Sequence, residues 1–435
     1  MAIDKYEQSA AMGNTNASVA LGKIYEEGIG VKADLYTSFL QYHNAAQKMD
    51  PHALYKIGDL FEKGIEPSST EKNGKILGFY KRAIEHGSTK AAVRMAQIYE
   101  NGEYGQPKDS QKSIELYNSV VEEEEEAMNA IGKECYIRKD YKLAVELFTK
   151  AADKGNPTAM NNLGTCYELG KGVDKDILRA YDLYEESSRK GNAQAMSNLG
   201  FLYYKEAKLK NSEEQFLEAA HWFRYSVAED DSLKDSQYYL GLMHMNGEGI
   251  DKSLDLASTY FEKAAENGHD TSCLKLGDLC YSKPGNENKE RAYEWYSKGA
   301  QRGNSQCINN LALMLEVGFS QYSPNHKEAV RLYEEAVNYG NKDALFNLGL
   351  AYQNGIHYKI DEMKAIDLFK EAASQGHSNS IDYLIKLGII EDKHQFQAQN
   401  QPNQYSLEEE SEEEESEEEE NENDTFARAR TVSRK

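Results

Sequence analysis

The sequence predicts an all-α fold, a solenoid of about ten two-helix repeats that ends in an acidic tail. Three observations support this prediction. An apolar residue followed by Gly or Ala recurs at intervals of 32 to 41 residues. A second signal alternates with it, an aromatic residue followed three and four positions later by two small or β-branched residues, as in Phe261-Glu-Lys-Ala264-Ala265. Proline, which interrupts helices, occurs only 7 times in 435 residues.

Both signals run through nearly the whole chain, which length alone would divide into two or three domains. The apolar-small pairs are Leu21-Gly22, Ile57-Gly58, Met95-Ala96, Ile131-Gly132, Leu163-Gly164, Leu199-Gly200, Leu240-Gly241, Leu276-Gly277, Leu311-Ala312 and Leu348-Gly349. The aromatic signal begins at Tyr6, Tyr42, Tyr80, Tyr117, Phe148, Tyr184, Phe223, Phe261, Tyr296, Tyr333 and Phe369. So many matches at one period indicate a repeat protein.

The first helix of each repeat contains the apolar-small pair. Counted from the Gly or Ala of that pair, apolar or small residues occupy Gly−5, Gly−1 and Gly+3, as in Ala159, Leu163 and Tyr167. At 100° per residue they lie within about 80° of one another, which predicts a buried stripe. The small residue allows a neighbouring backbone to approach closely, and this outweighs the cost of about 1 kcal/mol for Gly inside a helix.

The second helix carries the aromatic signal, and its small pair serves the same close packing. Glycines mark the ends of both helices, as expected for left-handed caps. Those after first helices are Gly28, Gly64, Gly102, Gly170, Gly247 and Gly355. Those after second helices are Gly87, Gly155, Gly191, Gly268, Gly303, Gly340 and Gly376.

The ends of the repeat array differ from its middle. Residues 4–13 are expected to form a second helix without its first, which caps the stack, and residues 378–390 to form the closing helix. We therefore predict a solenoid over residues 1–390. A polar linker over 391–404 and a disordered, Glu-rich tail with a basic end over 405–435 follow it.

The repeat motif resembles a known family. Its clearest copies are Ala17-x-x-x-Leu21-Gly22-x-x-Tyr25-x-x-Gly28-x-Gly30-Val31-x-x-Asp34 and the corresponding stretch from Ala159 to Asp176. This pattern is similar to the SEL-1-like repeat, a relative of the tetratricopeptide repeat, over nearly all of residues 1–388. The resemblance implies a right-handed α/α superhelix and an adaptor or scaffold role.

Two repeats depart from the motif. The repeat around Gly132 lacks the Gly-rich loop between its helices and resembles a plain tetratricopeptide unit. The repeat around Gly200 contains a charged insertion, residues 205–214, which we expect to bulge outward.

Charge excludes some classes of partner. The chain carries net charge −23, and residues 405–435 hold thirteen acidic against four basic side chains. Both parts of the chain repel phosphate, so nucleic acid and an anionic membrane surface are not expected partners. Residues 1–7 lack a leader pattern and no run of about 18 apolar residues occurs, which predicts no membrane insertion and a cytoplasmic or nuclear location.

Residues with chemical potential fall at structural positions of the repeat. Cys135, His244 and Cys280 occupy Gly+3, and Cys307 occupies Gly−5, where other repeats place core residues. The five cysteines form no Cys-x-x-Cys pair, and the ten histidines show no metal-ligand spacing. We therefore expect neither an enzyme nor a cofactor or metal site. A hydrolase of the cysteine-rich branch of the family would need paired cysteines, which are absent.

The opposite face of the first helix, at Gly−3, Gly+1 and Gly+4, supplies the candidate binding site, because in related superhelices it lines the concave groove. The later repeats are mostly apolar there. The candidate residues are Phe201, Tyr204, Tyr238, Leu242, Met245, Tyr281, Asn309, Leu313, Phe346 and Leu350. Two interpretations remain open: a groove that holds a peptide or partner helix, or packing between adjacent first helices.

The tail offers two further hypotheses. Its acidic run is either a solubilising appendage or a docking site for basic partners. Arg428 and Arg430 precede Thr431 and Ser433, which are candidate sites for a basophilic kinase.

The sequence therefore predicts a non-catalytic adaptor that binds proteins or peptides, whose identity and oligomeric state it does not specify. The alternative within the family is a substrate-recruiting subunit of a ubiquitin-ligase complex in ER-associated degradation. That alternative requires a signal peptide and usually a membrane anchor, and the sequence pattern leads us to expect neither.

Overall fold

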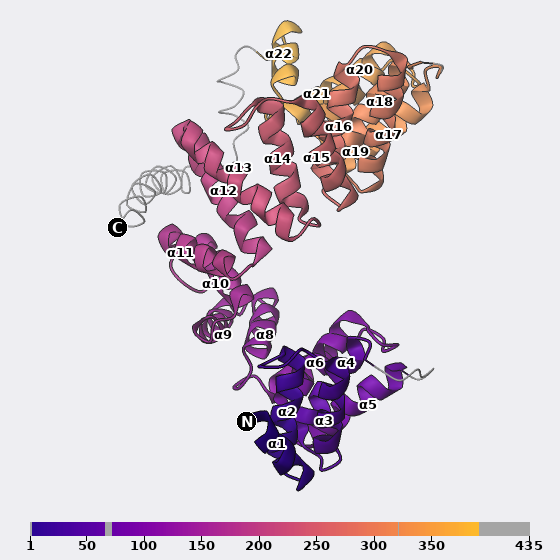
Figure 1. Cartoon of the computed structure of the whole chain (residues 1–435). Coiled ribbons are helices and arrows are strands. Elements are labelled where there is room, and N and C mark those ends of the chain that lie inside the picture. The colour runs from indigo at the N-terminus through magenta and orange to yellow at the C-terminus, as the bar shows by residue number, and fades with distance from the viewer. Residues whose placement is uncertain (1, 66–71, 321, 391–435) are drawn as a thin grey trace. The chain divides into compact units, whose positions relative to one another are not determined.

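A computed structural model describes residues 2–65, 72–320 and 322–390 (Figure 1). These residues form 22 α-helices and no β-strand apart from one isolated bridge between Phe319 and Tyr322. The helices form two compact units, which divide between Lys190 and Gly191. The all-α repeat fold expected from the sequence is confirmed.

The first unit contains eleven helices. They are α1 (Ala2–Ala11), α2 (Thr15–Glu27), α3 (Leu35–Ala46), α4 (Pro51–Glu62), α5 (Lys72–Glu85), α6 (Thr89–Asn101), α7 (Ser110–Ser119), α8 (Glu125–Ile137), α9 (Tyr141–Asp153), α10 (Pro157–Leu169) and α11 (Ile177–Arg189). From α2 onward, even-numbered helices are first helices and odd-numbered helices are second helices of a repeat.

The second unit continues the same alternation. Its helices are α12 (Ala193–Lys210), α13 (Glu213–Glu229), α14 (Lys234–Asn246), α15 (Leu254–Glu266), α16 (Asp270–Ser282), α17 (Asn286–Gln301), α18 (Ser305–Val317), α19 (His326–Asn338), α20 (Lys342–Asn354), α21 (Glu362–Ser374) and α22 (Ser378–Lys386). The closing helix α22 buries Ile381 and Leu384, as its pattern predicts.

In the eight repeats that carry Gly in the apolar-small pair, an aromatic ring of the second helix rests on that Gly. A Cβ atom added to Gly22 would lie 2.7 Å from the ring of Tyr42, and one added to Gly58 would lie 2.5 Å from the ring of Tyr80. The ring therefore occupies the space that a side chain would fill. Sequence reasoning expected a neighbouring backbone at this point, but the structure places a ring from the same repeat there.

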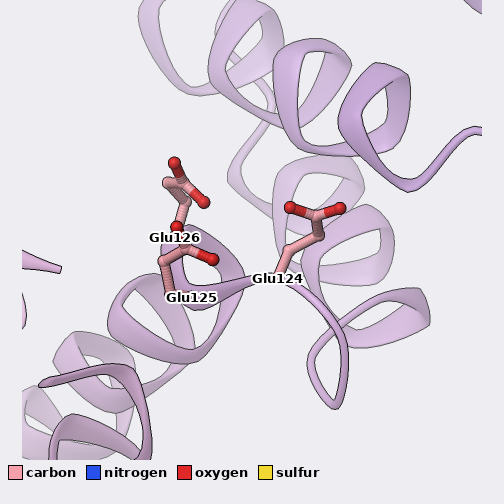
Figure 2. Close-up of side chains that lie close together, drawn as sticks. All are labelled: Glu124, Glu125 and Glu126. Carbon is pink, nitrogen blue, oxygen red and sulfur yellow. The ribbon is translucent and has the colours of Figure 1, made fainter. Parts of the chain in front are cut away.

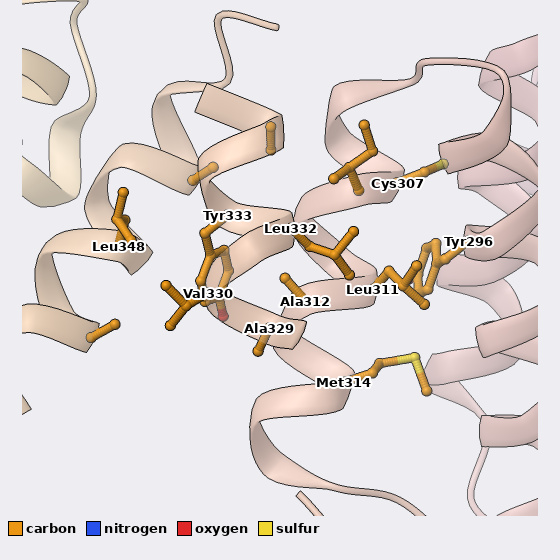
Figure 3. Close-up of a cluster of buried hydrophobic side chains, with 14 of the residues drawn as sticks. Tyr296, Cys307, Leu311, Ala312, Met314, Ala329, Val330, Leu332, Tyr333 and Leu348 are labelled. Atoms are coloured by element: carbon orange, nitrogen blue, oxygen red, sulfur yellow. The ribbon is translucent and has the colours of Figure 1, made fainter. Parts of the chain in front are cut away.

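In the part of the second unit from α15 to α22, buried side chains form one continuous core. Figure 3 shows Leu311 of α18 beside Tyr296 of α17 and Leu332 of α19, and Ala312 of α18 near Ala329 of α19. All five side chains are buried. The repeats therefore depend on their neighbours for burial, as in other solenoids.

Helix starts follow a regular capping rule. Asn is the most frequent cap of the first helices, and its side chain accepts the N–H of the third helical residue, at Asn14, Asn156, Asn192, Asn304 and Asn341. Second helices are usually capped by Asp, at Asp34, Asp109, Asp140, Asp176 and Asp361. Each cap contributes about 1 kcal/mol, so the repeat boundaries are well specified.

The insertion in the sixth repeat does not bulge, and that prediction was wrong. It lengthens both helices, because α12 continues to Lys210 and α13 already begins at Glu213. Asn211 makes the turn in a left-handed conformation with φ of 46°. Glu206 and Gln215 are buried between the lengthened helices, which gives the inserted residues a packed environment.

The fourth repeat has the short connection that its sequence predicts. Helix α8 ends at Ile137 and α9 begins at Tyr141, and Lys139 adopts φ of 65° in place of a glycine. Across the helices that the structure describes, none combines the length and apolar character that crossing a membrane requires.

Candidate functional site

The candidate site is the first-helix surface, defined as the residues at Gly−3, Gly−2, Gly+1 and Gly+4 of each first helix. In the first three repeats this surface is polar at most positions other than Gly−3, which holds Val19, Tyr55 and Val93. The Tyr42 hydroxyl donates to Glu26 over 3.0 Å, and the Tyr117 hydroxyl donates to Glu100 over 3.3 Å. Tyr80 hydrogen-bonds Glu62 in the same way. In each case a carboxylate at Gly+4 pairs with the ring of the second helix in the same repeat.

A cation from the next repeat completes two of these pairs. Lys56 Nζ lies 3.1 Å from Glu26, and Arg94 Nε lies 2.9 Å from Glu62; both cations occupy Gly−2. Burial acts to raise the pKa of Glu26, but hydrogen bonds from Lys56 and Tyr42 outweigh it and lower that pKa below its usual value. The surface of these repeats is therefore charged and internally satisfied.

Where the second-helix ring carries a hydroxyl, the first helix of the same repeat places a carboxylate next to it. Glu168 and Glu316, both at Gly+4, also accept from Tyr184 and Tyr333. Tyr296 donates instead to Asp278 at Gly+1, and the Gly+4 residue of that repeat is Tyr281. Four repeats carry Phe instead of Tyr, and their Gly+4 residues are Tyr136, Tyr204, Met245 and Gln353, none of which is acidic. Sequence reasoning missed this pairing, although both partners are visible in the sequence 16 to 18 residues apart.

The structure distributes the ten predicted site residues over three environments. Tyr204 and Asn309 are buried, with exposed fractions of 8% and 2%. Tyr281 and Leu313 are open to solvent, at 51% and 38%. The half-buried residues, which pack against the core, are Phe201, Tyr238, Leu242, Met245, Phe346 and Leu350.

An aromatic cluster dominates the first-helix surface of the sixth and seventh repeats. Tyr239 stacks on Phe223 with ring centroids 5.2 Å apart and also contacts Phe201 and Tyr204, at 5.4 Å and 5.1 Å. Tyr239 occupies Gly−2, the position of Lys56 and Arg94 in the first unit. It was not among the predicted residues, because Gly−2 was not included in the predicted face.

Two histidines connect this surface to the following repeats. The ring of His269 stacks on Tyr238 at 4.1 Å, and that of His377 lies 5.1 Å from Phe346. His377 caps α22, since its Nδ1 accepts the N–H of Ser380, and its Nε2 lies 3.3 Å from Asp343. Burial lowers the pKa of both imidazoles, so each favours the neutral form.

One cavity of about 210 Å³ lies on the first-helix surface of the fourth and fifth repeats. Its walls come from α8, α9 and α10. The lining residues are Lys133, Tyr136, Ile137, Phe148, Asn162 and Thr165. None of them belongs to the set predicted from the sequence.

Three carboxylates gather at the start of α8, as Figure 2 shows for Glu124, Glu125 and Glu126. Their oxygens lie within 4.8 Å of one another. Glu124 accepts a hydrogen bond from Thr89, and burial raises the pKa of Glu126. Acidic residues are favourable at a helix N-terminus, so this cluster alone does not indicate a metal site.

The remaining candidates occupy structural positions or lie outside the described residues. All five cysteines are free thiols, and Cys166, Cys273, Cys280 and Cys307 are buried. His244 is buried, with its Nδ1 3.0 Å from the carbonyl oxygen of Asp251. The candidate phosphorylation sites Thr431 and Ser433 lie outside the described residues, as do the predicted linker and tail.

Comparison with solved structures supports the fold. The chain superposes on a protective antigen of uropathogenic Escherichia coli that displays the SLR fold, with a TM-score of 0.69 and 23% sequence identity. The match covers 92% of this chain and 85% of that one. At this identity the likeness concerns the fold alone.

Curated relatives match over part of their length. Chitin synthase regulator SKT5 of Saccharomyces cerevisiae is 26% identical over 62% of this chain and 35% of its own length. DAP3-binding cell death enhancer 1 of Rattus norvegicus is 36% identical over 44% of this chain and 37% of its own length. An uncharacterized protein of Neisseria meningitidis is 24% identical over 77% of this chain and 67% of its own length. The chain thus spans little more than a third of the yeast and rat proteins.

A family model for the Sel1 repeat matches ten segments, in the register of the helix pairs. The segments are 15–46, 51–88, 89–119, 126–156, 157–192, 193–231, 234–269, 271–304, 305–341 and 342–377. They cover most of the chain, which therefore belongs to the Sel1 repeat family.

Proposed function

We propose that this protein is a non-catalytic adaptor that holds protein partners on the first-helix surface of its second unit. The observation that carries the proposal is the combination of exposed Tyr281 and Leu313 with half-buried Phe201, Tyr238 and Leu242 on one series of helices. Aromatic and aliphatic side chains in such a setting bind partner proteins, because they lose unfavourable contact with water. Sel1 repeat proteins are typically protein-interaction scaffolds.

The environment of the nucleophiles and bases supports a non-catalytic role. Burial raises the pKa of Cys166 to about 11 and that of Cys307 to about 12, which keeps both thiols protonated and unreactive near neutral pH. His269 and His377 have their Nδ1 atoms engaged by serines of their own helices, at 2.9 Å and 2.8 Å. Because both serines are buried, neither pair presents a nucleophile to a substrate.

The names of two relatives point to the same class of function, since one protein regulates an enzyme and the other binds a protein. Free cysteines suit a reducing compartment, which favours the cytoplasm or nucleus as the place of action. The identity of the partner does not follow from these names.

The proposal is tested by the double variant Y281S/L313S, compared with the matched variant L217S/Y225S. Leu217 and Tyr225 are 54% and 50% exposed but lie on the second helix α13. Partners are identified by proximity labelling in the native cell and quantified by mass spectrometry. We expect the Y281S/L313S variant to lose partners of the unmodified protein, and the L217S/Y225S variant to keep them. Thermal unfolding should be unchanged in both, since the side chains are exposed. An unchanged partner set in Y281S/L313S would contradict the proposal.

A further inference from the structure

The cavity of the fourth and fifth repeats exists because two groups found in other repeats are absent. Phe148 has no hydroxyl, unlike Tyr184 at the same position of the fifth repeat. The Gly+4 residue is Tyr136, whose ring turns toward Tyr141 with centroids 5.1 Å apart. The space that a Tyr–Glu pair occupies elsewhere is therefore left open above Phe148, and about 210 Å³ remains.

The polar groups that line this cavity have unused bonding capacity. Lys133 forms no ion pair with any described residue, whereas Lys23, at Gly+1 of the first repeat, pairs with Glu27 at 3.9 Å. Asn162 donates from Nδ2 to Asn129 over 2.8 Å, and its Oδ1 has no donor within the described part of the chain. The cavity thus presents one cation and one hydrogen-bond acceptor.

Thr165 is the third polar side chain of the lining, and its hydroxyl already hydrogen-bonds the Asn161 carbonyl oxygen and the Tyr184 hydroxyl, each over 3.1 Å. The remaining lining residues are mainly apolar. Phe148 and Tyr136 supply rings, and Ile137 beside them is 72% exposed, an unusual degree for Ile. A volume of about 210 Å³ lies below the range of roughly 300–1,000 Å³ typical of pockets for drug-sized ligands. These dimensions suit a single side chain rather than a cofactor.

We propose that this cavity binds an apolar side chain of a partner polypeptide that carries a carboxylate next to it. The apolar group occupies the space above Phe148 and covers Ile137. The carboxylate pairs with Lys133, and a backbone N–H of the peptide donates to Asn162 Oδ1. This inference rests on the proposed function, because it assumes that the chain binds polypeptides. It concerns different residues, which lie in the first unit.

The local charge of Lys133, rather than the net charge of the chain, favours this occupant. The chain has net charge −23, so acidic segments are repelled over most of its surface. An unpaired lysine beside an apolar cavity is a place where a carboxylate gains a partner without displacing another one. A basic peptide would instead meet the Lys133 ammonium as a like charge.

The experiment uses three labelled ten-residue peptides and the full chain, with binding followed by fluorescence anisotropy at low salt. One peptide has a central Leu flanked by Glu, the second has Ala in place of that Leu, and the third has Lys in place of the flanking Glu. The Glu–Leu peptide should bind at least about tenfold more tightly than either control. Equal binding of all three, or preference for the Lys-flanked peptide, would overturn the proposal.

Two variants locate the binding event. Lys133→Glu should weaken binding of the Glu–Leu peptide at least about tenfold, whereas Lys23→Glu, the same change at the same repeat position, should not. The methyl resonances of Ile137 should shift on titration with the Glu–Leu peptide in the unmodified chain. Both lysines are exposed, so both variants are expected to fold. Loss of binding in Lys23→Glu to the same extent, or an unperturbed Ile137, would contradict a site at this cavity.

The outcome is separate from that of the proposed function. If Y281S/L313S loses partners while Lys133→Glu binds the peptide normally, the adaptor role stands and the cavity proposal fails. If Lys133→Glu loses the peptide while Y281S/L313S keeps its partners, the cavity is a binding site and the second-unit surface is not.

Discussion

The first-helix surfaces of repeats 1–3 and of repeats 6–7 differ in chemistry, although both stand on the same scaffold. In the early repeats Glu26 and Glu62 join a tyrosine to a cation of the next repeat. In the later ones Phe223 has no hydroxyl, and Tyr239 covers it at the position of that cation. The presence or absence of the hydroxyl on the second-helix ring therefore accompanies the difference between a charged and an aromatic first-helix surface.

The largest effect on stability is expected at a contact that both regions contain, the one between a second-helix ring and the glycine of the first helix. Gly58→Ala and Gly241→Ala each place a Cβ atom within 2.6 Å of a buried ring, so each should lose about 3 kcal/mol of stability in its unit. The control is Gly78→Ala in α5, which has open space around it and should gain about 1 kcal/mol. Midpoints of urea unfolding measure the difference. Equal midpoints for Gly58→Ala and Gly78→Ala would refute the role assigned to the ring.

A smaller effect should follow from removing the carboxylate in the polar region. Glu62→Ala leaves the Tyr80 hydroxyl without its acceptor and deprives the Arg94 guanidinium of one carboxylate, so we expect a loss of about 2 kcal/mol. Adding Tyr80→Phe to that variant removes the orphaned hydroxyl and should recover about 1 kcal/mol. Urea unfolding of both variants checks this. A double variant less stable than Glu62→Ala would show that the two groups do not act as a pair.

Acidification should weaken the histidine contacts of the second unit. Because burial depresses the folded-state pKa of His269 and His377, the unfolded chain binds protons first as the pH falls below about 6.5. The two histidines therefore make their full contribution to folding stability above pH 6.5, and this contribution is lost as the pH falls toward their lower pKa in the folded state. The variant H269N/H377N places Asn, a good helix-capping residue, at both positions and does not titrate there, so its unfolding temperature should change less between pH 7 and pH 5. His52 of the first unit, whose pKa is also lowered, remains as an internal reference.

The smallest effect concerns the edge of the aromatic region. Lys205 Nζ lies 5.6 Å from the centroid of the Phe201 ring, in an exposed cation–π contact. Lys205→Ala should cost about 0.5 kcal/mol. Lys205→Arg should retain the contact and serves as the control. Thermal unfolding measures the stability of both variants. A loss of stability as large in Lys205→Arg as in Lys205→Ala would show that the positive charge does not account for the effect.

Much of the fold could be predicted because each signal occurs many times, the apolar-small pair ten times and the aromatic signal eleven times. The apolar-small pair, the ring and the glycine caps each repeat, so a single atypical copy does not hide the pattern. The insertion of the sixth repeat occurs once. Whether it bulges or extends the helices depends on the burial of Glu206 and Gln215, which its charged composition does not suggest.

The candidate site was harder to predict, for two physical reasons. Burial of Tyr204 and exposure of Tyr281, both at Gly+4, depend on neighbouring repeats rather than on position within one repeat. The cavity arises from groups that the fourth repeat lacks, the hydroxyl at Phe148 and the carboxylate at Tyr136. A repeat pattern identifies residues that recur, so a cavity formed by the absence of two groups from one repeat is hard to predict from it.

The ring-and-carboxylate pairing also suggests a route by which such repeats diverge. A tyrosine codon becomes a phenylalanine codon through one base change, and the carboxylate then still keeps a neighbouring cation, as Glu62 keeps Arg94. Loss of the carboxylate first would leave a buried hydroxyl without an acceptor, which is the more costly order. After duplication, a repeat can therefore pass from a charged to an aromatic surface by way of phenylalanine without an unstable intermediate.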